Sequence, residues 1–306
     1  MYYQHSGRYT FGGLIVGLVS GTISALVLAY AYARGSILIP EVHLAAFATL
    51  FFGGLVGLAT GWGLVRGKVR NQRVALVVTA LVSTFALYSS WAMWIAAVGK
   101  RWANKDISWA ILAQHPVAVW TLMKWINHYG TWSLDNSGSA TSATKGLELW
   151  FIWAGEALLI VGVATAAGFA VVRQRPFCEA CNRWCRDGAR VLLAPPPDAQ
   201  QLKLQVESND LRPLEALGPG SKTDDHLIVA LHSCDQCNQF HTLTLTQMSM
   251  HRKKFGHPRV SSKTIIRQLV VGPGEAQTLR QLSEKVAQAP KLAPERACGA
   301  AVGGKR

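Results

Sequence analysis

Long apolar runs alternate with short polar connections over the first half of the chain. Four of these runs reach the length of about 20 residues that a helix needs to cross a bilayer. They are residues 11–33, 44–65, 74–98 and 149–172. Only the last run contains a charged residue, Glu156. The pattern therefore predicts an α-helical transmembrane bundle of four spans over residues 1–175.

The overall composition supports this prediction. Of the 306 residues, 50% are hydrophobic and only 16% are charged, which excludes an ordinary soluble enzyme and a mostly disordered chain. A cleavable signal peptide is the alternative for residues 11–33. It is disfavoured, since that run exceeds the usual apolar length of about 7 to 15 residues and a second span follows closely.

Basic residues in the short connections predict the orientation of the spans. Residues 66–73 hold four cations and no acid, and such loops stay on the cytoplasmic side. The N-terminus and everything after Val172 are then cytoplasmic, in what we expect to be a bacterial inner membrane. Lys100, Arg101 and Lys105 oppose this orientation, because they fall on the outer side.

Glycines recur at every fourth position in the first two spans. The two sets are Gly13, Gly17 and Gly21, and Gly53, Gly57 and Gly61. This spacing clears one stripe of each helix and lets backbones approach closely in a membrane. We expect a tightly packed hairpin of these two spans. A self-associating surface, which would make a homo-oligomer, and a pore-lining surface are the alternatives.

Glu156 is a single acid within an apolar span. A carboxylate is costly there, so it should face the bundle, be protonated or meet a polar partner. One interpretation is a site that handles protons or cations. The other is a glutamate that is hydrogen-bonded near the interface. An intramembrane basic partner, which would strengthen the case for transport, is missing from the four runs.

The connection over residues 99–148 belongs to the outer face and is rich in Trp. Nine of the eleven Trp lie between Trp91 and Trp153, and Trp favours the headgroup zone. Residues 117–128 place apolar side chains at helical spacing, which predicts an interfacial amphipathic helix. Its apolar face is formed by Val119, Trp120, Met123 and Ile126. A sugar- or ligand-binding aromatic surface is the alternative.

All six Cys follow the last span, and four of them form two matched pairs. The pairs read Cys178-Glu-Ala-Cys181-Asn and Cys234-Asp-Gln-Cys237-Asn. Two residues between thiolates allow both sulfurs to reach one tetrahedral ion, and a reducing compartment favours metal over disulfides. The residue after the second Cys of such a motif often adopts a turn conformation that favours Gly or Asn.

These two motifs resemble the knuckles of a zinc ribbon. The resemblance covers about a fifth of the chain and implies that Cys178, Cys181, Cys234 and Cys237 bind one structural zinc. It departs from the compact form, because 52 residues separate the pairs instead of about 15 to 20. We expect this insertion to fold as an excursion of its own. As a whole, the chain is similar to bacterial membrane proteins of unassigned activity.

Two other chemistries are open for the cysteines. A thiol redox protein would need a CxxC motif within a βαβ pattern, which is absent. A catalytic zinc would need an open ligand position, whereas four thiolates complete a closed site. Cys185 has no second copy, and Cys298 lies in the Ala- and Gly-rich terminus. No serine-nucleophile elbow, HExxH motif or phosphate-binding loop is present, so we do not expect an enzyme.

The remainder of the tail predicts a small α+β zinc-ribbon-like domain over residues 176–288, followed by a disordered segment, 289–306. Expected strands and helices alternate along this domain. The strands are 189–193, 226–231, 240–246 and 264–271, and the helices are 199–206, 211–217 and 274–288. A basic patch of this domain is expected to contact anionic lipid rather than nucleic acid. It comprises Arg252, Lys253, Lys254, Arg259 and Lys263.

Together these features predict an integral membrane protein whose cytoplasmic domain, held by structural zinc, acts in protein interaction or signalling. Its expected partners are membrane lipids and a cytoplasmic protein. One alternative is a small transporter or channel-like protein that uses Glu156 and is regulated by the tail. The other alternative is a thiol redox protein.

Overall fold

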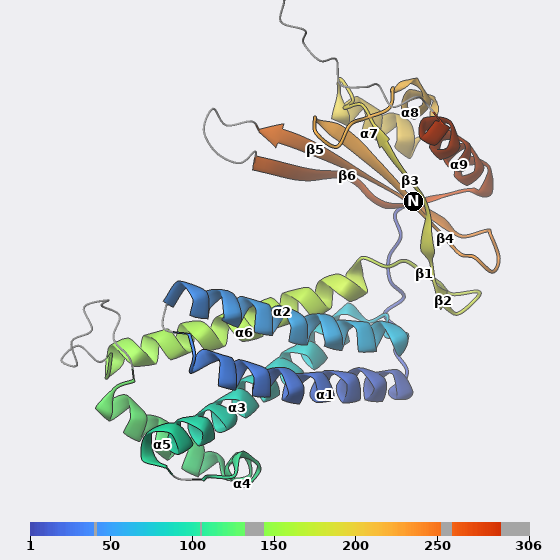
Figure 1. Cartoon of the computed structure of the whole chain (residues 1–306). Coiled ribbons are helices and arrows are strands. Elements are labelled where there is room, and N and C mark those ends of the chain that lie inside the picture. The colour runs from blue at the N-terminus through green and yellow to red at the C-terminus, as the bar shows by residue number, and fades with distance from the viewer. Residues whose placement is uncertain (40–41, 105, 132–143, 252–258, 289–306) are drawn as a thin grey trace, which may run out of the picture. The chain divides into compact units, whose positions relative to one another are not determined.

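The computed structural model describes residues 1–39, 42–104, 106–131, 144–251 and 259–288 (Figure 1). The chain divides into two units, which we describe separately. One unit is His5–Phe177, and the other combines Met1–Gln4 with Cys178–Arg306. The division lies two residues after the expected boundary at 175. It also assigns the first four residues to the C-terminal unit, which the sequence did not indicate. The segment 289–306, expected to be disordered, lies outside the described residues.

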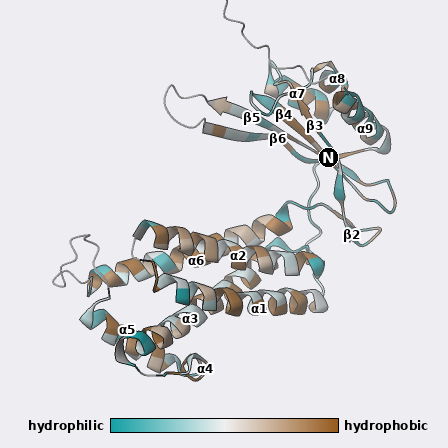
Figure 2. Cartoon of the chain, viewed as in Figure 1, coloured by the Kyte–Doolittle hydropathy of each residue, from teal (hydrophilic) through white to brown (hydrophobic). Residues whose placement is uncertain are grey.

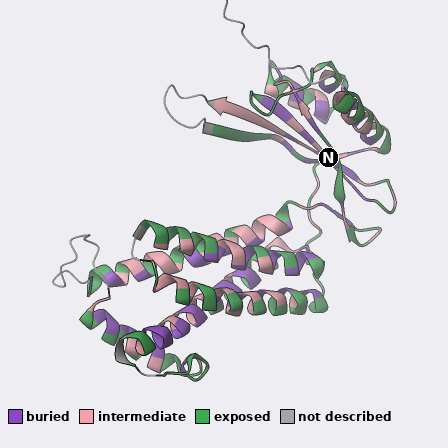
Figure 3. Cartoon of the chain, viewed as in Figure 1, coloured by how far each residue is buried: buried purple, intermediate pink, exposed green. Residues whose placement is uncertain are grey.

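Four long helices form the unit His5–Phe177, and all four are long and apolar enough to cross a membrane. The helices are α1 (Phe11–Ser36), α2 (Val42–Arg66), α3 (Gln72–Ala103) and α6 (Leu147–Arg173). The prediction of four candidate spans is therefore confirmed. Large apolar side chains such as Phe51 and Leu158 are exposed on the bundle surface, as expected of helices that face lipid. Figures 2 and 3 show hydrophobic and exposed segments along the helices of this unit.

The two glycine stripes serve different interfaces. In α1, a Cβ at Gly13 would lie 2.1 Å from the carbonyl oxygen of Gly67, next to the end of α2. The stripe of α2 instead faces α6, where a Cβ at Gly57 would lie 2.1 Å from the carbonyl oxygen of Ala164. The first two spans thus pack closely together, as expected of the hairpin, through the stripe of α1, whereas the stripe of α2 packs against α6. Glycine allows α2 to pack closely against both neighbours.

Two shorter helices, α4 (Trp109–Ala113) and α5 (Pro116–Tyr129), follow α3. Helix α5 corresponds to the helix expected over 117–128. Val119, Met123 and Ile126 are buried in a cluster with residues of α3 and α6, as the helical spacing predicted. Trp120 differs, because it is half exposed and its ring lies 5.0 Å from that of Trp150. This cluster closes one end of the bundle with aromatic and aliphatic side chains.

The C-terminal unit is built on an antiparallel sheet with the strand order β3-β4-β5-β6. These strands are β3 (Arg186–Leu193), β4 (His226–Ser233), β5 (His241–His251) and β6 (Arg259–Val271). A separate pair of two-residue strands, β1 (Phe177–Cys178) and β2 (Arg183–Trp184), precedes them. Each expected strand is present. The insertion between the Cys pairs is not a separate excursion, because it supplies β3 and β4 of the main sheet.

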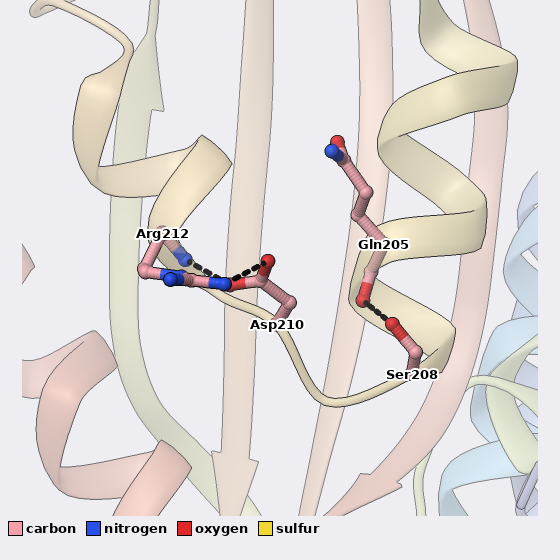
Figure 4. A network of polar contacts seen from close by, with 4 residues as sticks. All are labelled: Gln205, Ser208, Asp210 and Arg212. Atoms are coloured by element: carbon pink, nitrogen blue, oxygen red, sulfur yellow. Dashed lines mark hydrogen bonds and ion pairs between the residues drawn. The ribbon is translucent and has the colours of Figure 1, made fainter.

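Three helices cover one face of this sheet (Figure 1). They are α7 (Ala199–Glu207), α8 (Arg212–Ala216) and α9 (Pro273–Gln288). Alternate residues of β4, such as Leu227 and Leu231, point into the shared core, which also contains Leu202 and Leu279. The turn between α7 and α8 is fixed by Ser208, which donates to the carbonyl of Gln205, and by an Asp210–Arg212 pair (Figure 4).

The first residues of the chain extend the sheet beyond β6. Tyr2 pairs with Leu269 in antiparallel register, and the Tyr3 amide donates to the carbonyl of Gln268 at 2.9 Å. Gln268 has a positive φ of 53° where the β5–β6 register shifts. The N-terminal residues therefore cover part of an edge that would otherwise present unpaired backbone groups.

Candidate metal centre

Strand pairing explains how two Cys motifs 52 residues apart meet. Strand β3 begins directly after the first motif, and β4 ends directly before the second. The two strands are antiparallel, with Arg186 opposite Ser233. The residues next to these positions, Cys185 and Cys234, are therefore brought to the same end of the sheet. The long insertion runs away from the first motif along β3 and returns to the second motif along β4. Its length therefore does not separate the two motifs in space.

Both Cys motifs are followed by a residue with the same left-handed backbone conformation. The asparagine that follows each second Cys has a left-handed backbone, with φ of 50° at Asn182 and 49° at Asn238. Asn is one of the few residues that adopts this region readily. The Asn238 amide donates to the carbonyl of Cys234 at 3.2 Å, which closes the second turn. The turn conformation expected from the sequence is thus present in both motifs.

The four sulfurs lie close enough together to hold one metal ion. The Sγ atoms of Cys178, Cys181, Cys234 and Cys237 all lie within 4.8 Å of one another. Those of Cys178 and Cys237 are 3.8 Å apart. A tetrahedral ion with metal–sulfur distances of about 2.3 Å has sulfur–sulfur edges of about 3.8 Å. None of the five described cysteines forms a disulfide. The residues present therefore fit a metal ion.

The electrostatics of the cluster also favour a cation. Backbone N–H groups of Gln239 and Phe240 help to lower the pKa of Cys237 to about 6. Hydrogen bonding to Cys237, together with burial, raises the pKa of Cys181 to about 12. Burial raises the pKa of the Cys178 thiol as well. Thiols this close resist joint ionisation, because each thiolate repels the next, and a bound cation would remove that penalty.

A chain of polar contacts links the second Cys motif to strand β4 and helix α9. Nε2 of the buried His241 lies 2.9 Å from the carbonyl oxygen of Asn238, so Nε2 carries the proton and donates. Nδ1 then accepts from the Ser233 hydroxyl at 2.9 Å, and Arg280 of α9 donates to the same hydroxyl at 3.3 Å. This supporting role of His241 has no local sequence signal, because it depends on the strand register.

The other cysteines are placed differently. Cys185 is buried and packs against Cys178 and Cys234, but it is not among the four residues whose sulfurs converge. Burial is the main cause that raises the pKa of Cys185 to about 12. Cys298 lies outside the described residues. Cys185 is therefore part of the wall of the site.

The remaining residues singled out from the sequence are separate from this cluster. Glu156 lies in α6 and accepts a hydrogen bond from Tyr32 of α1. The glycine stripes lie between helices of the bundle, as described above. Of the basic patch, Lys263 is exposed on β6 and Arg259 begins that strand. Residues 252–254 of the patch lie outside the described residues.

Comparisons with known proteins add no family. No protein-family model matches the chain, and neither a curated protein nor a solved structure matches it. The fold and the site define a class of protein on their own. It has four helices able to cross a membrane and an α+β domain with a four-cysteine cluster that could hold a metal ion.

Proposed function

We propose that this protein is an integral protein of a bacterial inner membrane whose cytoplasmic domain uses structural zinc and mediates protein interaction or signalling. The observation that carries the proposal is the convergence of four Cys sulfurs within 4.8 Å. A tetrahedral set of four thiolates is typical of zinc or an iron–sulfur centre. Four protein ligands fill the zinc coordination sphere, which is the arrangement of structural sites rather than catalytic ones.

One face of the sheet supports an interaction role. The helices α7, α8 and α9 bury the opposite face, whereas Leu192, Ile228 and Ala230 are only partly buried. Leu192 lies opposite Ile228 in the register, and Thr246 is the neighbour of Ile228 on β5. Among the described residues, no helix packs on this side. This face combines apolar and Thr side chains with Arg190, which lies opposite Ala230. Such a mixed surface is typical of protein interfaces.

The proposal predicts that Cys178→Ser removes both metal and partner. In the full-length protein, a photo-crosslinking residue at position 228 should capture a cytoplasmic protein in cells. We expect about one zinc per chain by elemental analysis, since one tetrahedral site uses all four thiolates. Cys178→Ser should abolish zinc binding and the crosslink together, because the domain loses the ion that holds its two Cys motifs.

Cys185→Ser is the matched control. It changes a buried Cys beside the cluster without removing one of the four converging sulfurs, so zinc and the crosslink should persist. Purified protein that is metal-free and yet resists proteolysis in the tail would refute structural zinc. A zinc-bound protein whose position 228 captures no protein would refute the interaction role. Iron in place of zinc would contradict structural zinc and indicate a redox centre instead.

A further inference from the structure

A cavity of about 490 Å³ lies within the helical bundle. It is at the end where α1 finishes and where α2 and α6 begin, the end that is closed by α5. Its volume is in the range of small-ligand pockets, about 300 to 1,000 Å³. The lining combines aromatic rings with a few polar groups. Those used below are Tyr32, Trp91, Trp94, Arg101, Trp153 and Glu156.

The polar part of the cavity is organised around Glu156. The Tyr32 hydroxyl donates to Oε1 of Glu156 at 2.5 Å and lies 2.9 Å from the hydroxyl of Thr49. The Tyr32 ring stacks on Phe52 with a centroid distance of 4.7 Å, which fixes its position. Within the described part of the chain, Oε2 has no hydrogen-bond partner and Glu156 forms no ion pair. The second carboxylate oxygen is thus free to face a bound cation. A carboxylate without a charged partner is costly within an apolar span.

Three Trp side chains form the aromatic part of the lining. The centroids of Trp91 and Trp94 each lie 6.4 Å from that of Trp153. Trp153 is one helical turn before Glu156 on α6, so ring and carboxylate share a face of that helix. Indole faces carry negative electrostatic potential and attract cations, above all organic ammonium groups. Arg101, the basic lining residue, is exposed at the end region of α3.

We propose that this cavity binds an organic ammonium ion, with Glu156 as its counter-ion and the Trp rings as its walls. The apolar walls favour an ammonium with alkyl substituents over a hydrated metal cation. The cavity also borders Phe151 and Leu159, which are exposed on the bundle surface. The ammonium therefore comes either from a lipid headgroup or from a free cation. The inference is independent of the metal centre and of the function proposed for it.

The test uses the full-length protein in phosphatidylglycerol nanodiscs, titrated with tetraethylammonium while Trp emission is recorded. We expect a saturable change in emission, because three Trp line the cavity. Glu156→Gln should weaken binding about ten-fold or more, since it removes the counter-ion but keeps an oxygen for Tyr32. Glu148→Gln is the control, because Glu148 is exposed two turns earlier on the same helix. It should leave binding unchanged.

A second pair of variants tests whether a loss of binding comes from the cavity itself rather than from misfolding. Trp94→Phe should weaken binding, whereas Trp109→Phe, outside the cavity lining, should not. Adding phosphatidylethanolamine to the nanodisc distinguishes the two sources. A weaker apparent affinity assigns the site to the lipid headgroup, and an unchanged affinity assigns it to a free cation. No saturable response in the native protein, or equal binding by the Glu156→Gln and native proteins, would overturn the proposal.

Discussion

At the scale of single residues, two asparagines decide the shape of the metal centre. Asn182 and Asn238 repeat the same left-handed backbone at equivalent places in the two motifs. For most L-residues this conformation costs roughly 1–2 kcal/mol. The repetition of Asn in the sequence is therefore explained by the backbone. At the second motif, this backbone directs the Asn238 carbonyl to His241 and its amide to Cys234.

We expect Asn238→Ala to weaken metal retention. Alanine in the left-handed region should cost about 1 kcal/mol relative to Asn, which corresponds to about five-fold in affinity. Competition with a zinc chelator on the full-length protein measures this change. Asn209→Ala is the control, since Asn209 has a φ of 65° at the end of α7 but is not part of either motif. Asn238→Gly should retain zinc like the native protein, and weak retention by this variant would contradict the backbone explanation.

At the scale of elements, the sequence indicated which segments form but not which faces meet. Apolar run length gave the four spans, and alternation along residues 241–246 gave β5, because both patterns follow from local periodicity. The two Cys motifs were also found from local spacing. The contact of Gly57 with Ala164 of α6, and not with α1, depends on tertiary packing and has no local signal. The support of Asn238 by His241 was missed for the same reason.

The packing of α2 against α6 predicts a position-specific effect of alanine. Gly57→Ala should destabilise the bundle by about 1–3 kcal/mol, because its Cβ would meet the backbone of Ala164 and push the helices apart. Thermal unfolding of the detergent-solubilised protein provides the measurement. At Gly54, the nearest atom to an added Cβ is Val163 Cγ1 at 3.9 Å, an ordinary contact. Gly54→Ala should therefore be neutral or stabilising. Equal losses at both positions would show that the close contact is not required.

At the scale of the whole molecule, the first residues of the chain pair with the C-terminal sheet. Met1–Gln4 belong to the same unit as the C-terminal sheet, through the pairing of Tyr2 with Leu269. If the four long helices cross a membrane, the first residues and the C-terminal sheet lie on the same side of it, which requires an even number of crossings. Four candidate spans satisfy this condition. Lys100, whose charge opposes the predicted orientation, forms an ion pair with Asp106 at 2.5 Å.

We therefore expect residues of the α3–α4 connection to be outside and those of the C-terminal domain to be inside. Ser108→Cys should react with a membrane-impermeant maleimide in intact spheroplasts, whereas Ser221→Cys should react only after lysis. Ser108 and Ser221 are both exposed, so the reaction with the reagent depends on the side of the membrane rather than on burial. The native cysteines all follow α6 and should stay unlabelled in intact spheroplasts together with Ser221→Cys. Labelling of Ser221→Cys before lysis would reverse the orientation. The basic segment 66–73 would then lie outside, against the rule that keeps such loops cytoplasmic.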